Sequence, residues 1–372
     1  MFLENIYLNN FKNYSEVSLT FSEGINSLVG KNGSGKTNLL DAIYYLCFTK
    51  SAFNAIDIQN IRHEQPYFAI RGRMKKHEHD YAVSCSLKTG HKKRLKLNNK
   101  DLDRASELIG LFPAVLIAPN DGSIITEGSE MRRKFFDGMM CQLSRTYLQN
   151  LVHYNHTLKQ RNTLLKLLAE NSNPDADLLD TYDVQMIVKG TQIYHHRKNF
   201  IEKFTHLLNK HYDFISSEKE HVSCKYKSDL DQNEFKLLLR ESRNRDVSLQ
   251  RTSRGIHRDD VIFEIDNYAL KKFGSQGQQK SFLIALKLAQ FDIMEQDTNT
   301  KPILMLDDIF DKLDDDRIGK LLKLIDDHFF GQVFITDARP ERTMQFLNRV
   351  ESPKKIFEIE DGFVIRERSY ES

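Results

Sequence analysis

The sequence has few of the features that mark secreted, zinc-binding or membrane proteins. Its four cysteines are far apart and match no zinc-ligand spacing, which favours reduced thiols in a cytosolic protein. The first residues hold no basic stretch followed by an apolar core, so no signal peptide is expected. No apolar run approaches the ~20 residues that cross a bilayer. We therefore expect a cytoplasmic protein without a membrane segment.

The chain also lacks the large excess of positive charge that would indicate a nucleic-acid-binding protein. With 54 basic and 52 acidic residues its net charge is only +2, so such a surface must come from local clusters. Candidate clusters are Lys75-Lys76, His91-Lys92-Lys93-Arg94 with Lys96, Arg132-Arg133-Lys134, and Arg251, Arg254 and Arg258. Each alone is more simply a solvated face, and Arg132 and Arg133 can instead pair with acids inside the fold. No recognition-helix or zinc-finger pattern suggests base-specific contacts.

An α/β pattern is present, interrupted by a long helical segment. At 372 residues the chain is long enough for two or three domains. Alternating apolar residues predict strands within 1–29 and 66–99, and alternation returns after residue 260. Between them, apolar residues recur at helical spacing over 143–165 and 182–208, with a turn at 171–175. We expect these two helices to form an antiparallel arm.

Residues 30–37 match the phosphate-loop pattern Gly-x-x-x-x-Gly-Lys-Thr at every defined position. Its glycines let backbone N–H groups surround phosphates, Lys36 reaches the β- and γ-phosphates, and the Thr37 hydroxyl binds Mg²⁺. An ordinary glycine turn is the alternative, but a predicted strand precedes the loop and a predicted helix follows it. The predicted ATP-binding residues here are Gly30, Lys31, Asn32, Gly33, Ser34, Gly35, Lys36, Thr37 and Asn38.

Two carboxylates follow a second apolar strand, Ile303 to Leu306. Such a strand is buried in an α/β fold, and ligands bind at the carboxyl ends of its strands. We predict that Asp307 holds Mg²⁺ and that Asp308, with Lys36, is catalytic, positioning or deprotonating the attacking water. A buried strand that ends in acids is also common as a purely structural element.

A third motif, Gly274-Ser275-Gln276-Gly277-Gln278, precedes a predicted helix over 281–296. The hydroxyl of Ser275 and the free N–H groups of the loop can bind an anion at a helix N-terminus. The alternative is a helix cap that binds no ligand.

This third motif resembles the signature of ABC-type ATPases of DNA repair, and the whole chain resembles the RecF family of bacterial recombination mediators. Further segments that carry the resemblance are Leu8–Tyr14, Arg132–Asp137, Leu158–Lys166, Gly255–Asp260 and Asp311–Asp314. The implied fold is an α/β, ABC-type ATPase head with an inserted helical arm. We place the head at residues 1–130 and 254–372 and the mainly helical arm at 131–253.

The resemblance implies a head-to-tail dimer in which ATP held by one phosphate loop is covered by the partner's signature loop. Ser275, Gly277 and Gln278 would then contact the nucleotide from the second subunit, Lys12 would contact it within the same subunit, and Asp311 and Asp314 would lie at the seam. The implied activity is a weak, DNA-dependent ATPase that forms a clamp on DNA. Such a clamp would bind single- and double-stranded or gapped DNA without sequence preference, engage a RecR-like mediator, and serve replication, recombinational repair and SOS induction.

Three positions depart from the family pattern. Lys12 stands where the family usually has Arg, which keeps the charge but loses the fork geometry. Ile256 replaces a usual Pro. Thr336 and Asp337 stand where transporter-type ATPases have a switch His, so the sensor of the γ-phosphate is not assigned. Asn120-Asp121 falls in the Q-loop region without an assigned role.

Alternative functions remain open from the sequence. One is a nucleotide-gated DNA-binding module for which hydrolysis is incidental. Another is the ATPase subunit of a membrane transporter, which predicts a Leu-Ser-Gly-Gly-Gln signature and a switch His, neither of which is present. Relatives of the chromosome-maintenance type would need a far larger coiled-coil insertion.

Overall fold

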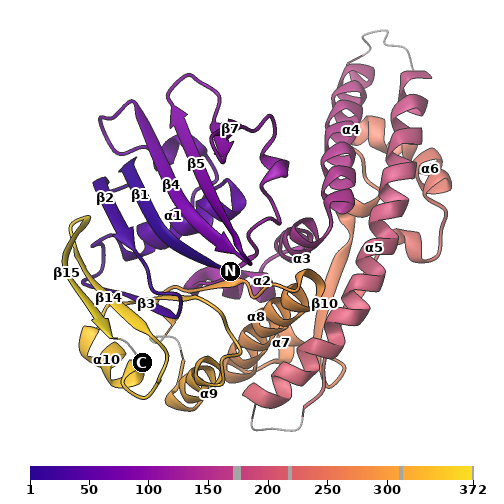
Figure 1. Ribbon diagram of the computed structural model, residues 1–372. Coiled ribbons are helices and arrows are strands. Elements are labelled where there is room, and N and C mark those ends of the chain that lie inside the picture. The colour runs from indigo at the N-terminus through magenta and orange to yellow at the C-terminus, as the bar shows by residue number, and fades with distance from the viewer. Residues whose placement is uncertain (171–176, 217–219, 310–312, 371–372) are drawn as a thin grey trace. The chain divides into compact units, whose positions relative to one another are not determined.

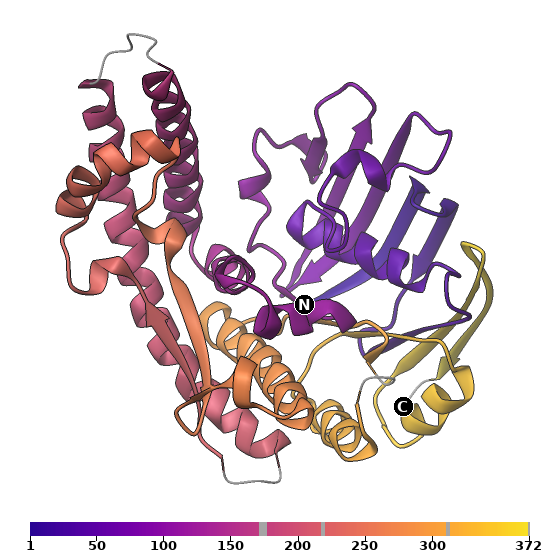
Figure 2. The ribbon, with the colours of Figure 1, turned by 180° about the vertical axis from the view of Figure 1, so that it is seen from behind.

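The computed structural model describes residues 1–170, 177–216, 220–309 and 313–370, and these form two compact units. Unit 1 contains residues 1–121 and 290–372, and unit 2 contains residues 122–289. The predicted turn at 171–175, together with Asp311, lies outside the described residues. The ribbon is drawn in Figure 1 and from behind in Figure 2.

Unit 1 is built on two six-stranded sheets. The first is antiparallel, in the order β2-β1-β4-β5-β6-β7. Its strands are β1 (Phe2–Phe11), β2 (Tyr14–Thr20), β4 (Tyr67–Lys76), β5 (His79–Lys88), β6 (Arg94–Leu97) and β7 (Lys100–Asp101). The strands predicted within 1–29 and 66–99 are thereby confirmed.

The second sheet has the order β15-β14-β3-β13-β12-β8 and is parallel except for the β14–β15 hairpin. Its strands are β3 (Ile25–Val29), β8 (Ala114–Ile117), β12 (Ile303–Leu306), β13 (Val333–Asp337), β14 (Lys354–Glu360) and β15 (Phe363–Tyr370). Every residue of β3, β12 and β13 is buried, as is typical of the centre of a parallel sheet.

Helix α1 (Lys36–Phe48) connects the two sheets, because it contacts β13 of the parallel sheet and β1 and β4 of the antiparallel one. Side chains from α1 and from both sheets form one hydrophobic core, in which Leu39, Leu46 and Phe334 are fully buried. The buried amide of Gln332 further joins the sheets, since its Nε2 donates to the carbonyl oxygen of Leu3 at 2.9 Å and its Oε1 accepts from the Leu3 N–H at 2.8 Å. Unit 1 also contains α9 (Asp315–Asp326) and α10 (Pro340–Leu347).

Unit 2 is mainly helical. Its helices are α2 (Ser123–Thr126), α3 (Ser129–Leu143), α4 (Arg145–Ala169), α5 (Asp177–Ile215), α6 (Phe235–Leu249) and α7 (Leu270–Phe273), and α8 (Gln276–Thr298) crosses the boundary between the units. Helices α4 and α5 contact each other, and the predicted stripe from Met186 through Ile193 to Phe204 is the buried face of α5. A small sheet is also present, in the order β11 (Tyr268–Ala269), β10 (Asp260–Ile265), β9 (Val222–Lys227).

The boundaries between the two units differ from the predicted domain boundaries. Their boundaries lie at 121/122 and 289/290, whereas the sequence prediction placed them at 130/131 and 253/254. The reason is the β9–β10 pairing, which joins residues 260–265 to residues 222–227. The contact of α3 with β10 strengthens the same grouping, so the segment with the signature loop packs with unit 2.

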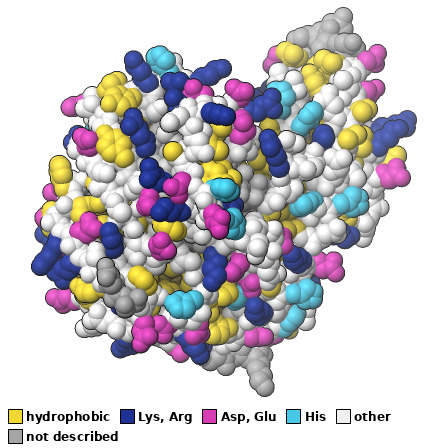
Figure 3. All heavy atoms as spheres, viewed as in Figure 1, with side chains coloured by type: hydrophobic (Ala, Val, Ile, Leu, Met, Phe, Trp, Pro, Cys, Tyr) yellow, Lys and Arg dark blue, Asp and Glu magenta, His cyan; other side chains and the backbone are white. Residues whose placement is uncertain are grey.

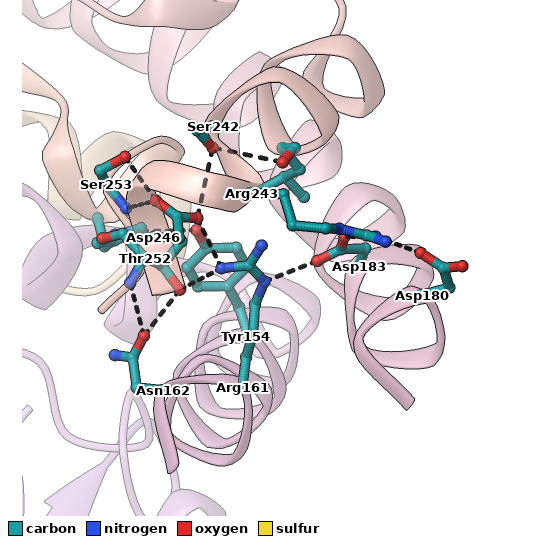
Figure 4. Close-up of polar contacts among 12 residues, drawn as sticks. Tyr154, Arg161, Asn162, Asp180, Asp183, Ser242, Arg243, Asp246, Thr252 and Ser253 are labelled. Carbon is teal, nitrogen blue, oxygen red and sulfur yellow. Dashed lines mark hydrogen bonds and ion pairs between the residues drawn. The ribbon is translucent and has the colours of Figure 1, made fainter. Parts of the chain in front are cut away.

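A buried charge network ties three helices of unit 2 together (Figure 4). Arg161 of α4 is fully buried and donates to Asp183 of α5 at 2.6 Å and to Asp246 of α6 at 2.8 Å. The same guanidinium donates to the Thr252 hydroxyl at 2.9 Å. Carboxylates from separate helices therefore neutralise one buried arginine.

No helix among the residues that the structure describes is long and apolar enough to cross a membrane.

Candidate functional site: a phosphate loop with two carboxylates

The phosphate loop is the turn between β3 and α1. Gly30 and Gly35 have φ values of 153° and 119°, which side chains rarely adopt. A Cβ at Gly30 would lie 2.1 Å from the carbonyl oxygen of Ile359, and a Cβ at Gly35 would lie 2.6 Å from Nδ2 of Asn13. Both positions therefore require glycine for conformation and for space, whereas a Cβ at Gly33 would meet nothing within 4 Å.

Residues far away in the sequence hold this loop. Asn13 Nδ2 donates to the carbonyl oxygen of Ser34 at 3.1 Å, and the Tyr14 hydroxyl donates to that of Gly35 at 3.0 Å. Asn38 Nδ2 donates to Asn13 Oδ1 at 2.8 Å. The sequence argument used Asn13 and Tyr14 only as part of the Leu8–Tyr14 resemblance and missed their contact with the loop.

Lys36 is the first residue of α1, and its side chain turns back over the loop. Its ammonium donates to the carbonyl oxygens of Gly30 at 2.8 Å and of Lys31 at 2.9 Å, and the residue is only 3% exposed. Among the described residues no carboxylate lies within salt-bridge distance of it. The hydroxyl of Ser34 is likewise buried and has no hydrogen-bond partner among them. A buried cation that contacts no described carboxylate, beside an unsatisfied hydroxyl at a helix N-terminus, fits an anionic ligand.

Asp307 lies beside this loop because β12 and β13 are parallel neighbours in the centre of the sheet. The hydroxyls of Thr37 and Thr336 each donate to Asp307 Oδ1 at 2.8 Å. Burial raises the pKa of the Asp307 carboxyl, and the two hydroxyl hydrogen bonds oppose that rise. The predicted Mg²⁺ ligands Thr37 and Asp307 are thus in direct contact.

The donor set fits Mg²⁺, which is usually held by one or two carboxylates together with phosphates and water. No group of three or more His, Cys, Asp or Glu that could hold a metal ion occurs in the part of the chain that the structure describes. A dedicated protein-only metal cage is therefore not what these residues build.

Asp308 follows in a left-handed conformation, with a φ of 43°. Its N–H donates to the Thr336 hydroxyl at 2.9 Å, so Thr336 bridges the two acids. Non-glycine residues in this region are strained and cluster at functional sites. Asp337, by contrast, accepts hydrogen bonds from the Arg339 N–H and the Thr343 hydroxyl and so joins the end of β13 to the first turn of α10.

Lys12 forms an ion pair with the buried Asp41, with Nζ 2.6 Å from Oδ2. The carboxylate of Asp41 also accepts from the Ser51 hydroxyl and the Ala52 N–H, at 2.6 Å and 2.7 Å. The predicted contact of Lys12 with a nucleotide stays a prediction.

A cavity of about 430 Å³ lies next to Lys31, Asn32 and Ser34. Its wall includes Glu358, Glu360 and Asp361. Because these carboxylates repel phosphates, we place the phosphate site on the side of Lys36 and Thr37 instead.

The signature loop lies in unit 2, at the start of α8. The Ser275 hydroxyl accepts from the Gln278 N–H at 3.1 Å, and Gln278 Oε1 accepts from the Ser275 N–H at 2.7 Å. This reciprocal pair is a capping box, so the cap considered from the sequence is present. Gln278 Nε2 also donates to Glu220 at 2.6 Å, and the Tyr212 hydroxyl donates to the other oxygen of Glu220 at 2.5 Å. Gly277 lies in the first turn of α8, and Ser275 itself is exposed.

Comparisons with known proteins agree with this geometry. The family model described as the RecF/RecN/SMC N terminal domain matches residues 2–363. The curated "DNA replication and repair protein RecF" of Flavobacterium johnsoniae is 46% identical over 96% of this chain and all of its own length. The chain belongs to the RecF family.

Solved structures extend the comparison. The recombination mediator RecF of the RecFOR pathway, in a structure described as RecF-ATP, has a TM-score of 0.88 at 30% identity and covers 99% of this chain and 97% of its own. The Smc head domain of Pyrococcus furiosus has a TM-score of 0.56 at 15% identity, which supports the fold alone. The predicted ABC-type head architecture is thereby confirmed, and the transporter hypothesis is not supported.

Basic residues in two of the predicted clusters of this RecF-family protein form hydrogen bonds and ion pairs inside the fold. Arg132 donates to both oxygens of Asp260, at 2.8 Å and 3.0 Å, and Arg133 donates to the carbonyl oxygen of Asp259 at 2.6 Å. Lys93 donates to Asp57 at 2.7 Å. The internal pairing with an acid that was the alternative for both residues is therefore present for Arg132, whereas Arg133 donates to a backbone carbonyl and to the Ser129 hydroxyl.

Proposed function

We propose that this RecF-family protein is an ATP-dependent DNA-binding protein of replication and recombinational repair. ATP closes a dimer on DNA without sequence preference, and slow, DNA-dependent hydrolysis opens it again. The observation that carries this proposal is Lys36, a buried ammonium that donates to two backbone carbonyl groups, next to the Thr37–Asp307 contact.

Different groups of the phosphate loop contact different parts of the bound nucleotide in this proposal. The N–H groups of residues 31–37 and the N-terminal end of α1 stabilise phosphate charge, and Lys36 exchanges its two carbonyl contacts for phosphate oxygens. The orphaned hydroxyl of Ser34 gains a hydrogen-bond acceptor. Thr37 and Asp307 would hold Mg²⁺, whose charge offsets the charge that develops on the transferred phosphoryl group.

Asp308 is the proposed group that orients or deprotonates water. Its strained backbone and the hydrogen bond from its N–H to Thr336 fix its position relative to Asp307. Thr336 occupies the slot of the transporter-type switch His and is the residue through which the two acids are coupled.

A second subunit completes the site in this proposal. Ser275, Gly277 and Gln278 of one subunit cover the nucleotide held by the phosphate loop of the other, since Ser275 is exposed at a helix N-terminus. Asp314 caps α9 through the Arg317 N–H, at 3.0 Å, and we assign it to the seam between the subunits. Because ATP binds only the closed state fully, it favours the dimer by mass action.

The biological role follows the family. We assign to the clamp the loading of recombinase at gapped DNA, with a RecR-like mediator as partner, in the cytoplasm and upstream of SOS induction. Its DNA contacts are to phosphates, which makes binding salt-dependent.

The test is sedimentation and DNA binding with ATP, with ADP and without nucleotide. Of these three conditions, we expect only the one with ATP to promote dimerisation and DNA retention. If it promotes neither, the proposal fails.

Asp308→Asn separates the clamp from a nucleotide-gated module in which hydrolysis is incidental. The clamp predicts that this variant binds ATP and DNA but releases DNA more slowly as turnover is lost. Lost turnover with unchanged release kinetics would favour the module.

A further inference from the structure

The antiparallel sheet of unit 1 has one face packed against α1 and one face that carries basic residues. Along β4, Phe68, Ile70 and Met74 are fully buried. The alternate residues point the other way, and Tyr67, Arg71 and Arg73 among them are exposed. This face is turned toward the viewer in Figure 1.

The strand register arranges the residues of this face in rows across the sheet. Tyr7 pairs with Arg71, Arg71 with Ser84, and Ser84 with Lys96. The next row ends at Arg94, which pairs with Ser86. Arg71 and Lys96 are therefore two strand spacings apart, roughly 10 Å, with only a serine between them.

These rows form the floor of a groove of about 620 Å³, lined among others by Tyr7, Arg71, Arg73, Ser84, Arg94 and Lys96. Four of the described lining residues are basic and none is acidic. Figure 3 shows basic side chains over the part of the surface where β1, β4 and β5 lie in Figure 1. The groove is thus suited to an anionic polymer by its charge.

Three acids lie beside residues of the groove, and one of them, Glu16, accepts from the Tyr7 hydroxyl at 3.0 Å. Asp101 pairs with Arg94 at 2.6 Å, and Glu4 lies 3.6 Å from Arg73. The Arg94 pair is bidentate, with a second contact at 2.9 Å, but both of its side chains are at least half exposed, so solvent screens the pair. Arg71 instead lies with Cζ 5.6 Å from the centre of the Tyr7 ring. Because these arginines are exposed, phosphate groups can reach them from solvent.

We infer that this groove binds a single strand of DNA, an inference that rests on the proposed function and specifies where one form of its DNA is bound. Phosphates contact Arg71, Arg73, Arg94 and Lys96, and unstacked bases lie against the aromatic side chains Tyr7 and Tyr67. Small side chains at Ala82, Ser84 and Ser86 leave room for the strand. A duplex is a stiff cylinder with its bases stacked inside, so it would touch only the rim. Basic grooves with accessible aromatic rings are typical of single-strand binding.

The double variant Arg71→Ser with Lys96→Ser tests the groove in the full-length protein with ATP. Fluorescence anisotropy compares a labelled oligothymidine strand with a duplex of equal length, each at several salt concentrations. We expect single-strand affinity to fall about ten-fold, with a salt slope shallower by about 1.4 from two lost contacts, and duplex affinity to fall much less. Tyr67→Leu should weaken single-strand binding about five-fold or more without changing the salt slope.

The matched control is Lys236→Ser with Arg240→Ser, which removes the same two charges from exposed positions on α6. ATP binding by all variants should equal that of the wild type, which shows an intact fold. If the groove variant binds the single strand within two-fold of this control, the inference about the groove is overturned and the proposed function is not. If the groove variant loses as much affinity for the duplex as for the single strand, the inference is also overturned, because the groove then binds duplex. Absence of any DNA binding by the wild type would overturn the proposed function as well.

Discussion

Two buried cations, Lys36 of the phosphate loop in unit 1 and Arg161 in unit 2, have different kinds of hydrogen-bond partner. Arg161 lies between the carboxylates of Asp183 and Asp246, so its charge is balanced inside the protein. The ammonium of Lys36 meets backbone carbonyl groups, which carry no net charge. A balanced cation joins elements of the fold, whereas an unbalanced one fits a site whose counter-charge arrives with a ligand.

The largest expected effect is that of Arg161→Leu. The variant leaves the carboxylate of Asp246 buried without its cationic partner and leaves Asp183 with Arg243 alone, and breaking such a buried network costs about 3–5 kcal/mol of unfolding free energy. Denaturant unfolding followed by circular dichroism measures this loss. Lys159→Ser, an exposed change two residues away on the same helix, is the control and should stay within about 0.5 kcal/mol. Equal stability of the two variants would remove the structural half of the comparison.

Lys36→Ala should impair ATP turnover and leave stability nearly unchanged, which is the reverse of what we expect for Arg161→Leu. Turnover of ATP should fall about 100-fold or more, because the lysine stabilises phosphoryl charge, and ATP should no longer drive dimerisation. Unfolding free energy should change by less than about 1 kcal/mol, since no carboxylate loses its partner. Lys50→Ala, at an exposed lysine shortly after α1, is the control. A loss of stability as large as that of Arg161→Leu would show that Lys36 is structural too.

A pH titration probes the same unit as Arg161. Burial lowers the pKa of His257 to about 4, and Arg258, Arg133 and Arg161 nearby oppose its protonated form further. Its neutral ring accepts from the Tyr154 hydroxyl and donates to the carbonyl oxygen of Thr252. Since the unfolded chain takes up the proton near pH 6.5 and the folded one only near pH 4, stability is present above pH 6.5 and falls below it.

We expect a contribution of about 1–2 kcal/mol to be lost between pH 7 and pH 5. The measurement is the difference in unfolding free energy between the wild type and His257→Gln across this range. A difference that does not change with pH would show that His257 is not held neutral.

The smallest expected effect concerns Glu220, which holds the Gln278 side chain of the signature loop. Glu220→Ala should lower ATP turnover about five-fold, roughly 1 kcal/mol, with ATP affinity unchanged, because it loosens a loop that acts only in the dimer. Glu220→Gln keeps an acceptor for Gln278 and should restore most of the turnover. A matching loss of ATP affinity in Glu220→Ala would mean that the residue acts on the nucleotide site of its own subunit.

Much of the fold was predictable where local pattern and burial agree. The strand before Gly30, the helix after it and the buried strand before Asp307 all follow from short apolar runs with turn residues. The hairpin of β14 and β15 was not predicted, because all of β15 is exposed or half-buried and so gives no clear alternation. Helix α10, with eight residues, is too short for a clear helical stripe.

Of the candidate site, the residue types were predictable and most of their partners were not. The pattern of residues 30–37 indicates a phosphate loop, but Asn13 and Tyr14 support it from another strand. Arg132 and Arg133 illustrate the reverse case. Their pairing with Asp260 and with the backbone of Asp259 depends on a separation of more than 120 residues, which local pattern does not encode.

By itself, the sequence determined the chemistry: a phosphate loop, two acids after a buried strand and a capped signature loop are local motifs, set by residue type and spacing. Only the tertiary structure decided which charged side chains pair inside the fold and which are left to contact ligands. Lys36 and Arg161 are both basic residues in helical segments, and their different roles come from the carboxylates that packing brings to one and not to the other.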